Sequence, residues 1–403
     1  MSDVLAGIRV LEVATWTFVP SACAVLAEWG ADVIKVEDPV KGDPQRALIS
    51  SMLMPVDGIN FLTELPNRGK RSVGIDIKSA AGRELLYQLA AKADVFVTNF
   101  LPAVRQRLGI DLDDIRQHNP SIVYVRGSAV GPKGEEAGRG GFDVASYWAR
   151  GGLASALTPP GADRPLSPRN GFGDFMAGMA MAGGVAAALV KRERTGEGSV
   201  VDVSLLNLAM WQLGPDITSA KLYEGMDMPQ MDRDALPNPL TGTYATADGR
   251  HITLMMIQSD PFWADLCQHL DITDLTHDPR YADSKARFAN SRELTALLRR
   301  IFAGASYEEW CARLATLTGV WSPIRTPLEV HDDPQAQANG YFAHLVTNSG
   351  ATLDVPTNPV QFDETPPHVT GAPELGAQTE EVLLEMGLSF DDILALKAKG
   401  AVL

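Results

Sequence analysis

The chain has 403 residues, and its 50 acidic against 35 basic side chains give a formal net charge of −15 at pH 7. Nucleic acids and anionic membranes bind basic surfaces, so this charge argues against both as main partners. An anionic ligand would therefore need a local cluster of basic residues, and the length allows one large or two medium domains with a deep cleft.

Cysteine usage and the ends of apolar runs bear on the cellular compartment. Cys23, Cys267 and Cys311 are far apart and form no CxxC pair, so we expect reduced core cysteines and no metal site. The first residues lack the basic segment and apolar run of a secretory signal. The apolar run 185–190 ends at Lys191, short of a membrane span. These features predict a soluble, cytoplasmic protein.

The first 130 or so residues alternate between strand and helix patterns. Strands are expected at residues 8–13, 32–37, 72–76, 95–98 and 122–125, with helices at 20–29, 79–93 and 104–108. Such an alternation predicts a largely parallel sheet covered by helices. Ligands of these sheets bind beyond the carboxyl ends of the strands, so we expect a site lined by loops 14–19, 37–46 and 99–104.

The pattern changes near residue 226. Asp248-Gly249 between two strand-like segments predicts a hairpin, and helical patterns follow at 261–270, 291–302 and 307–317. A strand-like segment at 353–362 and a helix at 379–386 are expected to return to the first domain. We therefore predict a large domain, a smaller inserted α+β domain and a returning C-terminal segment, spanning residues 1–225, 226–327 and 328–403.

Gly171-Phe172-Gly173-Asp174 opens a helix expected at 175–193, which is rich in small residues and leads to a strand-like segment at 200–203. Small residues allow another backbone or a ligand to approach closely. Partial positive charge at the helix N-terminus should keep Asp174 ionised at neutral pH, as a nucleophile requires. The alternative is that Asp174 only caps the helix.

A dinucleotide-binding fold is an alternative for the sheet, because Glu37 at the end of the second strand resembles a ribose-binding acid. The turn after the first strand, Ala-Thr-Trp-Thr-Phe-Val-Pro at 14–20, contains no glycine. Pyrophosphate binding there needs bare backbone, so a nicotinamide enzyme is disfavoured. The sequence also lacks GxSxG, HExxH and P-loop motifs.

Basic residues occur in three sets next to the predicted sheet. They are Lys41 with Arg46, Arg68-Gly69-Lys70-Arg71, and Arg105 with Arg107. Any one of them is most simply a solvated surface charge. Convergence of the three sets on one edge of the sheet would suit a phosphate-rich ligand, and Arg46 is expected among its contacts.

Several segments, taken in order, carry a family resemblance. They are 5–12, 30–37, 67–76, 93–100, 173–174, 195–204, 287–288, 333–335 and 381–387. On these segments the chain resembles the class III CoA-transferases, which include formyl-CoA transferase, carnitine CoA-transferase and α-methylacyl-CoA racemase. The resemblance covers essentially the whole chain.

The resemblance implies an interlocked homodimer. Each chain would have a Rossmann-like large domain built from both termini, and the active site would lie between this domain and the small domain of the other chain. The family nucleophile falls on Asp174. Family contacts to coenzyme A fall on Thr17, Phe18, Lys70, Arg71, Asn99, Phe100 and Arg107. Coenzyme A would enter as the thioester substrate, and the resemblance implies no tightly bound cofactor.

Two departures from the family pattern favour transfer over racemisation. The racemase branch uses a proton-transferring His where this chain has Phe142, and a Glu where it has Ala245. Racemisation needs a base and an acid on opposite faces of the α-carbon, and neither residue can serve. The glycine-rich loop of formyl-CoA transferase has no counterpart near 238–244, which disfavours formate and oxalate as substrates.

The expected reaction is transfer of CoA from an acyl-CoA to a carboxylic acid through an aspartyl mixed anhydride and an aspartyl-CoA thioester, with backbone N–H groups of 171–173 as oxyanion donors. A racemase that uses other residues, and a catalytically silent subunit of a hetero-oligomer, stay open as alternatives. The apolar side chains that would either line an acyl pocket or form core are Trp16, Phe18, Tyr147, Trp148, Trp211 and the methionines at 226–231. They point to a bulky or dicarboxylic acid, with succinyl-CoA as one donor.

Overall fold

The structure is a computed structural model that describes residues 4–48, 59–159, 161–223, 232 and 234–403. The chain forms two compact units, one of Met1–Thr218 with Gln335–Leu403 and one of Ser219–Pro334. The domain boundary predicted between residues 225 and 226 falls outside the described residues. The boundary predicted between 327 and 328 stays a prediction.

A six-stranded parallel sheet forms the centre of the first unit, in the order β3-β2-β1-β4-β5-β6. Its strands are β1 (Arg9–Val13), β2 (Asp32–Glu37), β3 (Arg71–Gly74), β4 (Val95–Thr98), β5 (Val123–Ser128) and β6 (Val200–Ser204). All four residues of β4 are buried, as expected for a strand covered on both faces. The predicted α/β class and the parallel sheet are therefore confirmed.

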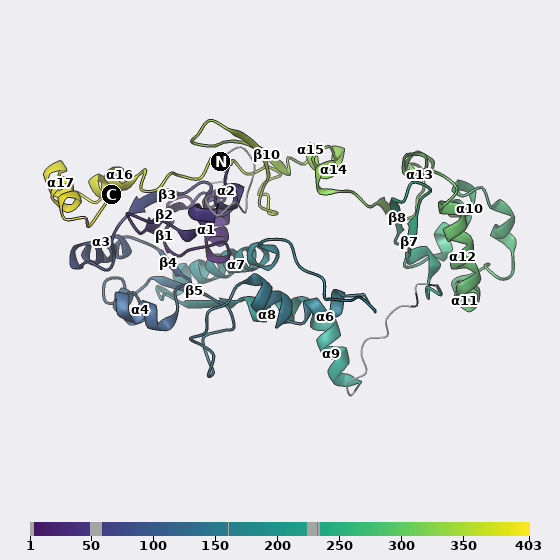
Figure 1. Cartoon of the computed structure of the whole chain (residues 1–403), viewed down its shortest axis with the longest axis horizontal. Coiled ribbons are helices and arrows are strands. Elements are labelled where there is room, and N and C mark those ends of the chain that lie inside the picture. Colours follow the sequence, from purple (N-terminus) through teal and green to yellow (C-terminus); the bar gives the residue numbers. More distant parts are fainter. Residues whose placement is uncertain (1–3, 49–58, 160, 224–231, 233) are drawn as a thin grey trace. The chain divides into compact units, whose positions relative to one another are not determined.

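Helices cover both faces of this sheet (Figure 1). Neighbouring strand residues such as Val10 and Leu11 belong to different hydrophobic cores, because successive side chains of a strand point to opposite faces. One core takes in α1 (Phe18–Glu28), α6 (Leu153–Leu157), α7 (Phe172–Thr195) and α8 (Leu205–Gln212). The other takes in α3 (Ala80–Ala91), α4 (Pro102–Leu108), α5 (Leu112–Arg116), α16 (Thr379–Glu385) and α17 (Phe390–Ala398).

The remaining elements of the first unit are short. They are α2 (Phe61–Asn67), the 3₁₀ turn Pro44–Leu48 and the π-helical turn Val144–Ala149. Helices α9 (Gly214–Leu222) and α15 (Pro334–Ala338) cross the two boundaries between the units. A two-stranded antiparallel sheet joins β10 (Phe342–Val346) to β11 (Thr352–Pro356), so the strand expected at 353–362 ends six residues early, at a proline.

The C-terminal segment closes the outer edge of the large sheet at β3. Thr379 Oγ1 accepts a hydrogen bond of 3.0 Å from the Gly74 N–H, and the Leu403 N–H donates to the Gly74 carbonyl over 3.0 Å. Ile75 forms an antiparallel bridge with Val402. The predicted return of the C-terminal segment to the first part of the chain is thus visible at this edge.

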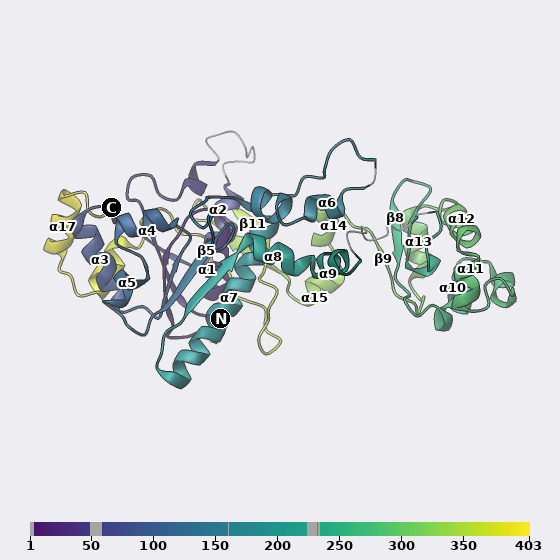
Figure 2. The same cartoon turned by 90° about the horizontal axis from the view of Figure 1, so that it is seen from below.

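Helices α1 and α7 pack closely against each other, as both views show (Figure 2). A Cβ atom added at Gly178 of α7 would lie 2.0 Å from Ser21 Oγ and 2.9 Å from the Ala22 backbone nitrogen of α1. The predicted close approach along this helix is therefore helix–helix packing at Gly178. By length and composition α7 is also apolar enough to cross a membrane, a test that core helices of soluble proteins pass as well.

The second unit holds three antiparallel strands, β7 (Thr243–Ala245), β8 (His251–Leu254) and β9 (Trp321–Pro323). The predicted hairpin between β7 and β8 turns at Gly249, whose φ of 77° lies in the left-handed region. The helices of this unit are α10 (Asp260–His269), α11 (Ser284–Ala289), α12 (Ser291–Phe302), α13 (Tyr307–Leu314) and α14 (Pro327–His331), with single turns at Pro239–Thr241 and Thr273–His277.

Candidate active site

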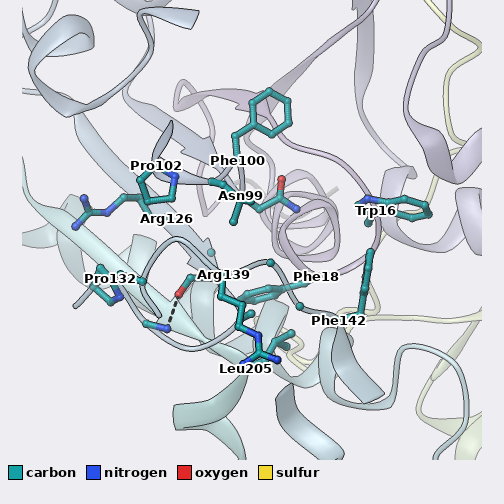
Figure 3. A pocket seen from close by; sticks show the side chains of 18 of the residues that line it. Trp16, Phe18, Asn99, Phe100, Pro102, Arg126, Pro132, Arg139, Phe142 and Leu205 are labelled. Carbon is teal, nitrogen blue, oxygen red and sulfur yellow. Dashed lines mark hydrogen bonds between the residues drawn. The ribbon is translucent and has the colours of Figure 1, made fainter. Parts of the chain in front are cut away.

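A cleft of about 680 Å³ lies beyond the carboxyl ends of β1, β4 and β5 (Figure 3). Trp16 and Phe18 line it from the segment after β1, and Asn99 and Phe100 line it from the segment after β4. Asp174 of α7 lines it as well. The first and third of the loops expected to line a site therefore do so.

Asp174 is the third residue of α7, because the helix begins at Phe172 rather than at the predicted Phe175. The N-cap is Gly171, which has a left-handed φ of 69° and no side chain that could accept a hydrogen bond from the first N–H groups of the helix. The interpretation of Asp174 as a simple cap is therefore wrong. Its half-buried carboxyl group is left to face the cleft.

Asp143 supplies the missing cap from another part of the chain. Its Oδ2 accepts a hydrogen bond of 3.0 Å from the Gly173 N–H, and the residue is 5% exposed. A Cβ at position 173 would lie 2.5 Å from the Tyr147 ring, so only glycine fits there. The Gly173 N–H, which was expected to serve an oxyanion, is thus already bonded to a carboxylate.

Burial, and the nearby negative charge of Asp143, raise the pKa of Asp174 from its ordinary value of 3.8 to about 7. The same burial raises the pKa of Asp143, against the effect of the backbone N–H groups it accepts. Burial and the charge of Asp143 thus oppose the helix N-terminus, which was expected to keep Asp174 ionised at neutral pH.

The turn after β1 is held by hydrogen bonds to its backbone. Trp16 has a φ of 70°, which is rare for a bulky side chain, and its N–H donates to Asp43 Oδ1 over 3.0 Å. Asn99 fixes Thr15, accepting its N–H at 3.1 Å and donating to its carbonyl at 2.7 Å. Loop 37–46 therefore supports the cleft through Asp43 without lining it.

A fully buried group of charges lies behind this turn. Lys35 Nζ contacts Glu12 Oε1 and Asp43 Oδ2 at 2.8 Å each, and it donates to the Ala14 carbonyl over 3.1 Å. Lys70 Nζ contacts the other oxygen of Glu12 at 2.5 Å. Burial alone would lower the pKa of Lys35, but Asp43 and Glu12 raise it above its ordinary value. Lys70, predicted to contact CoA, is thus enclosed in this charge group.

The predicted convergence of basic residues on one sheet edge is wrong. Arg46 pairs with Glu37 at the carboxyl end of β2, whereas Arg71 pairs with Asp32 at the amino end of β2. The two arginines therefore lie at opposite ends of this strand. Arg107 is exposed on α4 and does not line the cleft. Thr17 accepts a hydrogen bond of 3.2 Å from Gln45 Nε2 and is likewise not part of the cleft lining.

The cleft is also lined by three arginines that were not among the predicted contacts to coenzyme A. Arg126 of β5 makes two hydrogen bonds of 2.7 and 2.9 Å to Asp202, and Arg105 donates to the Phe100 carbonyl at 2.7 Å. Arg139 follows a glycine-containing loop. Arg126 directly follows the strand predicted at 122–125, and only that position could have indicated it. Arg105 belonged to one of the three predicted basic sets, but only Arg107 of that set was predicted to contact coenzyme A.

The aromatic residues proposed for an acyl pocket separate into two groups. Trp16 and Phe18 line the cleft, while Tyr147 and Trp148 are buried in the core. Trp211 is 84% exposed on α8. The methionines at 226–231 lie outside the described residues.

Comparisons with known proteins agree on one family. Residues 5–379 match the family described as CoA-transferase family III. A (R)-2-hydroxy-4-methylpentanoate CoA-transferase of Clostridioides difficile is 33% identical over 391 residues, covering 96% of this chain and 97% of that protein. A cinnamoyl-CoA:phenyllactate CoA-transferase of Clostridium sporogenes is 29% identical over 400 residues, covering 98% and 96%. The crystal structure of a CaiB/BaiF family protein from Brucella suis superimposes with a TM-score of 0.79 at 29% identity, covering 95% of this chain and 99% of that one.

Proposed function

Because this chain belongs to the CoA-transferase family III, we propose that it moves coenzyme A from an acyl-CoA to a carboxylic acid with Asp174 as the nucleophile. The observation that carries this assignment is the position of Asp174. Its carboxyl group lies at the head of α7 without capping the helix, and it lines a cleft of about 680 Å³. A carboxyl group so placed can meet a thioester that enters the cleft.

The reaction proceeds by exchange at two carbonyl carbons. The Asp174 carboxylate attacks the thioester carbonyl, the carbon–sulfur bond breaks, and CoA leaves as a thiolate from a mixed anhydride. The thiolate then attacks the aspartyl carbonyl and releases the donor acid, which leaves an aspartyl-CoA thioester. The acceptor carboxylate reverses both steps. No net proton transfer is required, and retention of CoA in the cleft supplies the advantage of proximity.

Coenzyme A contacts are assigned to the cleft lining. Phe18, Asn99 and Phe100, expected from the resemblance, lie there. Arg126 and Arg139 line it too, paired with Asp202 and Glu136, and their remaining N–H groups suit phosphates. The other predicted contacts do not line the cleft, so coenzyme A would have to reach them outside it. They are Thr17, Arg46, Lys70, Arg71 and Arg107.

An interlocked homodimer is the proposed assembly, and a second copy would complete the site. The first unit leaves large apolar side chains exposed on α7 and α8, including Met176 at 52%, Met210 at 47% and Trp211 at 84%. Apolar surface of this kind is typical of protein interfaces. Sedimentation or light scattering of the purified chain tests the assembly, and a monomer at micromolar concentration would contradict it.

Racemisation is the weaker alternative. Phe142 lines the cleft where a proton-transferring side chain would be needed, and Ala245 of β7 carries no acid. The acids named for the two relatives, 2-hydroxy-4-methylpentanoate and phenyllactate, both carry an apolar body next to a 2-hydroxy acid group. We therefore take 2-hydroxy acids with a branched or aromatic side chain as the first acceptors to assay.

The deciding experiment is the mass of the protein after incubation with a small panel of acyl-CoA thioesters, followed by peptide mapping. An acyl or CoA adduct on the peptide that contains Asp174 supports the mechanism. Asp174→Ala should lose the adduct and the transfer activity while retaining affinity for CoA. Glu193→Gln, an exposed carboxylate on the same helix, is the matched control. Normal turnover by Asp174→Ala would overturn the assignment.

A further inference from the structure

Trp16 and Phe142 form an aromatic pair in the wall of the cleft. Their ring centroids are 5.5 Å apart and the rings are nearly perpendicular, at 89°. Both side chains line the same cleft as Asp174, and Phe142 is 61% exposed. Phe142 therefore presents an apolar surface that a ligand would remove from water.

The conformation of Trp16 is strained, and buried charges maintain it. A left-handed backbone at a bulky residue persists only where the surrounding structure enforces it, and such strain gathers at functional sites. Asp43 Oδ1 accepts the Trp16 N–H, and the other oxygen of Asp43 is held by Lys35 at 2.8 Å. Both charged side chains are fully buried. The backbone of Trp16 is thus fixed by the protein interior before any ligand binds.

Phe142 lies near the head of α7, because it directly precedes Asp143, whose Oδ2 accepts the Gly173 N–H next to Asp174. Figure 3 shows Trp16 and Phe142 together on one side, with Arg126 at the far side of the pocket. In the proposed reaction, the thioester carbonyl of a bound acyl-CoA must reach the Asp174 carboxylate. The acyl group joined to that carbonyl would therefore lie in the cleft that Trp16, Phe142 and Asp174 line together.

We propose that Trp16 and Phe142 are specificity-determining residues, forming the wall against which the acyl group packs and selecting branched or aromatic acyl groups over short ones. The inference rests on the proposed function of the cleft. A short acyl group would end before the pair and gain nothing from it. A branched or aromatic group would cover both rings, with the edge-to-face and stacking contacts that aromatic pairs favour.

The test compares two donors in wild-type protein and variants. Phe142→Ala should lower the ratio of kcat/KM for 3-phenylpropanoyl-CoA to that for propionyl-CoA by about tenfold, as loss of apolar contact in a pocket does. Trp16→Ala should lower the same ratio, and Trp16→Phe should restore most of it. Phe390→Ala removes an aromatic ring that is 65% exposed on α17, outside the cleft, and should leave the ratio unchanged.

A ratio that is unchanged in both Phe142→Ala and Trp16→Ala would overturn the inference, as would a fall in both donors alike. Circular dichroism melts identify a variant that fails to fold, and Phe142→Ala, an exposed position, keeps the test open if Trp16→Ala does not fold. Failure of the proposed function is distinguishable from these results. In that case wild-type protein itself would form no adduct on Asp174 with either donor.

Discussion

Asp174→Asn should stabilise the folded protein, and the gain should depend on pH. The folded protein holds the pKa of Asp174 at about 7, against an ordinary value of 3.8. Between these values the folded chain keeps a proton that the unfolded chain has lost, so wild-type stability falls as the pH rises through this window. Asparagine has no proton to lose. The advantage of Asp174→Asn should therefore grow from about pH 4 to about pH 7 and stay constant above.

The size of the gain follows from the same interval. At about 1.4 kcal/mol for each pH unit, the interval from 3.8 to about 7 is worth at most about 4 kcal/mol. Solvent reaches the half-buried carboxyl group and screens it, which reduces the expected gain to roughly 2 kcal/mol. For a unit of this size that corresponds to a rise in Tm of about 4 °C.

Differential scanning fluorimetry or urea titration from pH 4 to pH 9 measures this difference. Glu193→Gln, an exposed substitution on the same helix, should follow wild type across the range. A difference in stability between Asp174→Asn and wild type that does not change with pH would refute the reasoning. It would mean that burial and Asp143 do not control the protonation of Asp174.

Three further outcomes are expected. Asp143→Asn removes the charge next to Asp174, so the pKa of Asp174 should fall and the acidic limb of the pH–kcat/KM profile should move to lower pH. An acidic limb at the wild-type pH would show that the charge of Asp143 does not influence the pKa of Asp174. Lys35→Met removes the buried cation that pairs with Asp43 and should cost about 3–5 kcal/mol in urea unfolding, while a loss below 1 kcal/mol would contradict the buried pairing. Gly178→Ala should destabilise by about 1–3 kcal/mol because its Cβ would meet α1, whereas Gly183→Ala, which meets nothing within 4 Å, should stabilise by up to about 1 kcal/mol.

The sheet could be predicted because buried strands leave an unmistakable pattern. Continuous apolar runs such as Val95-Phe96-Val97 mark strands covered on both faces, and their alternation with helices leaves little choice of topology. Helix and strand ends were less certain. The start of α7 lies three residues before the predicted one, because Gly171 begins the helix from a left-handed conformation that composition alone does not reveal.

The candidate site was only partly predictable. Asp174 could be found from its place at the start of a helix. The side chain that caps this helix, Asp143, lies about 30 residues earlier in the chain, and only folding brings it to Gly173. The basic residues gave a wrong prediction because other strands of the sheet bring acids to them: Lys70 pairs with Glu12 of β1, and Arg71 pairs with Asp32 of β2. Sequence position indicates charge but not which partner neutralises it.

The closure of the sheet edge at β3 has a consequence for how the protein is made. Gly74 at the end of β3 and Asp76 just after it hydrogen-bond to Leu403 and Ala401. These partners leave the ribosome more than 300 residues later, so the bonds cannot form until synthesis is nearly complete. The residues of the second unit, Ser219–Pro334, emerge before these bonds can form and have a core of their own. The second unit is thus free to fold during synthesis, while the outer edge of the large sheet at β3 is covered only when the C-terminal segment has been made.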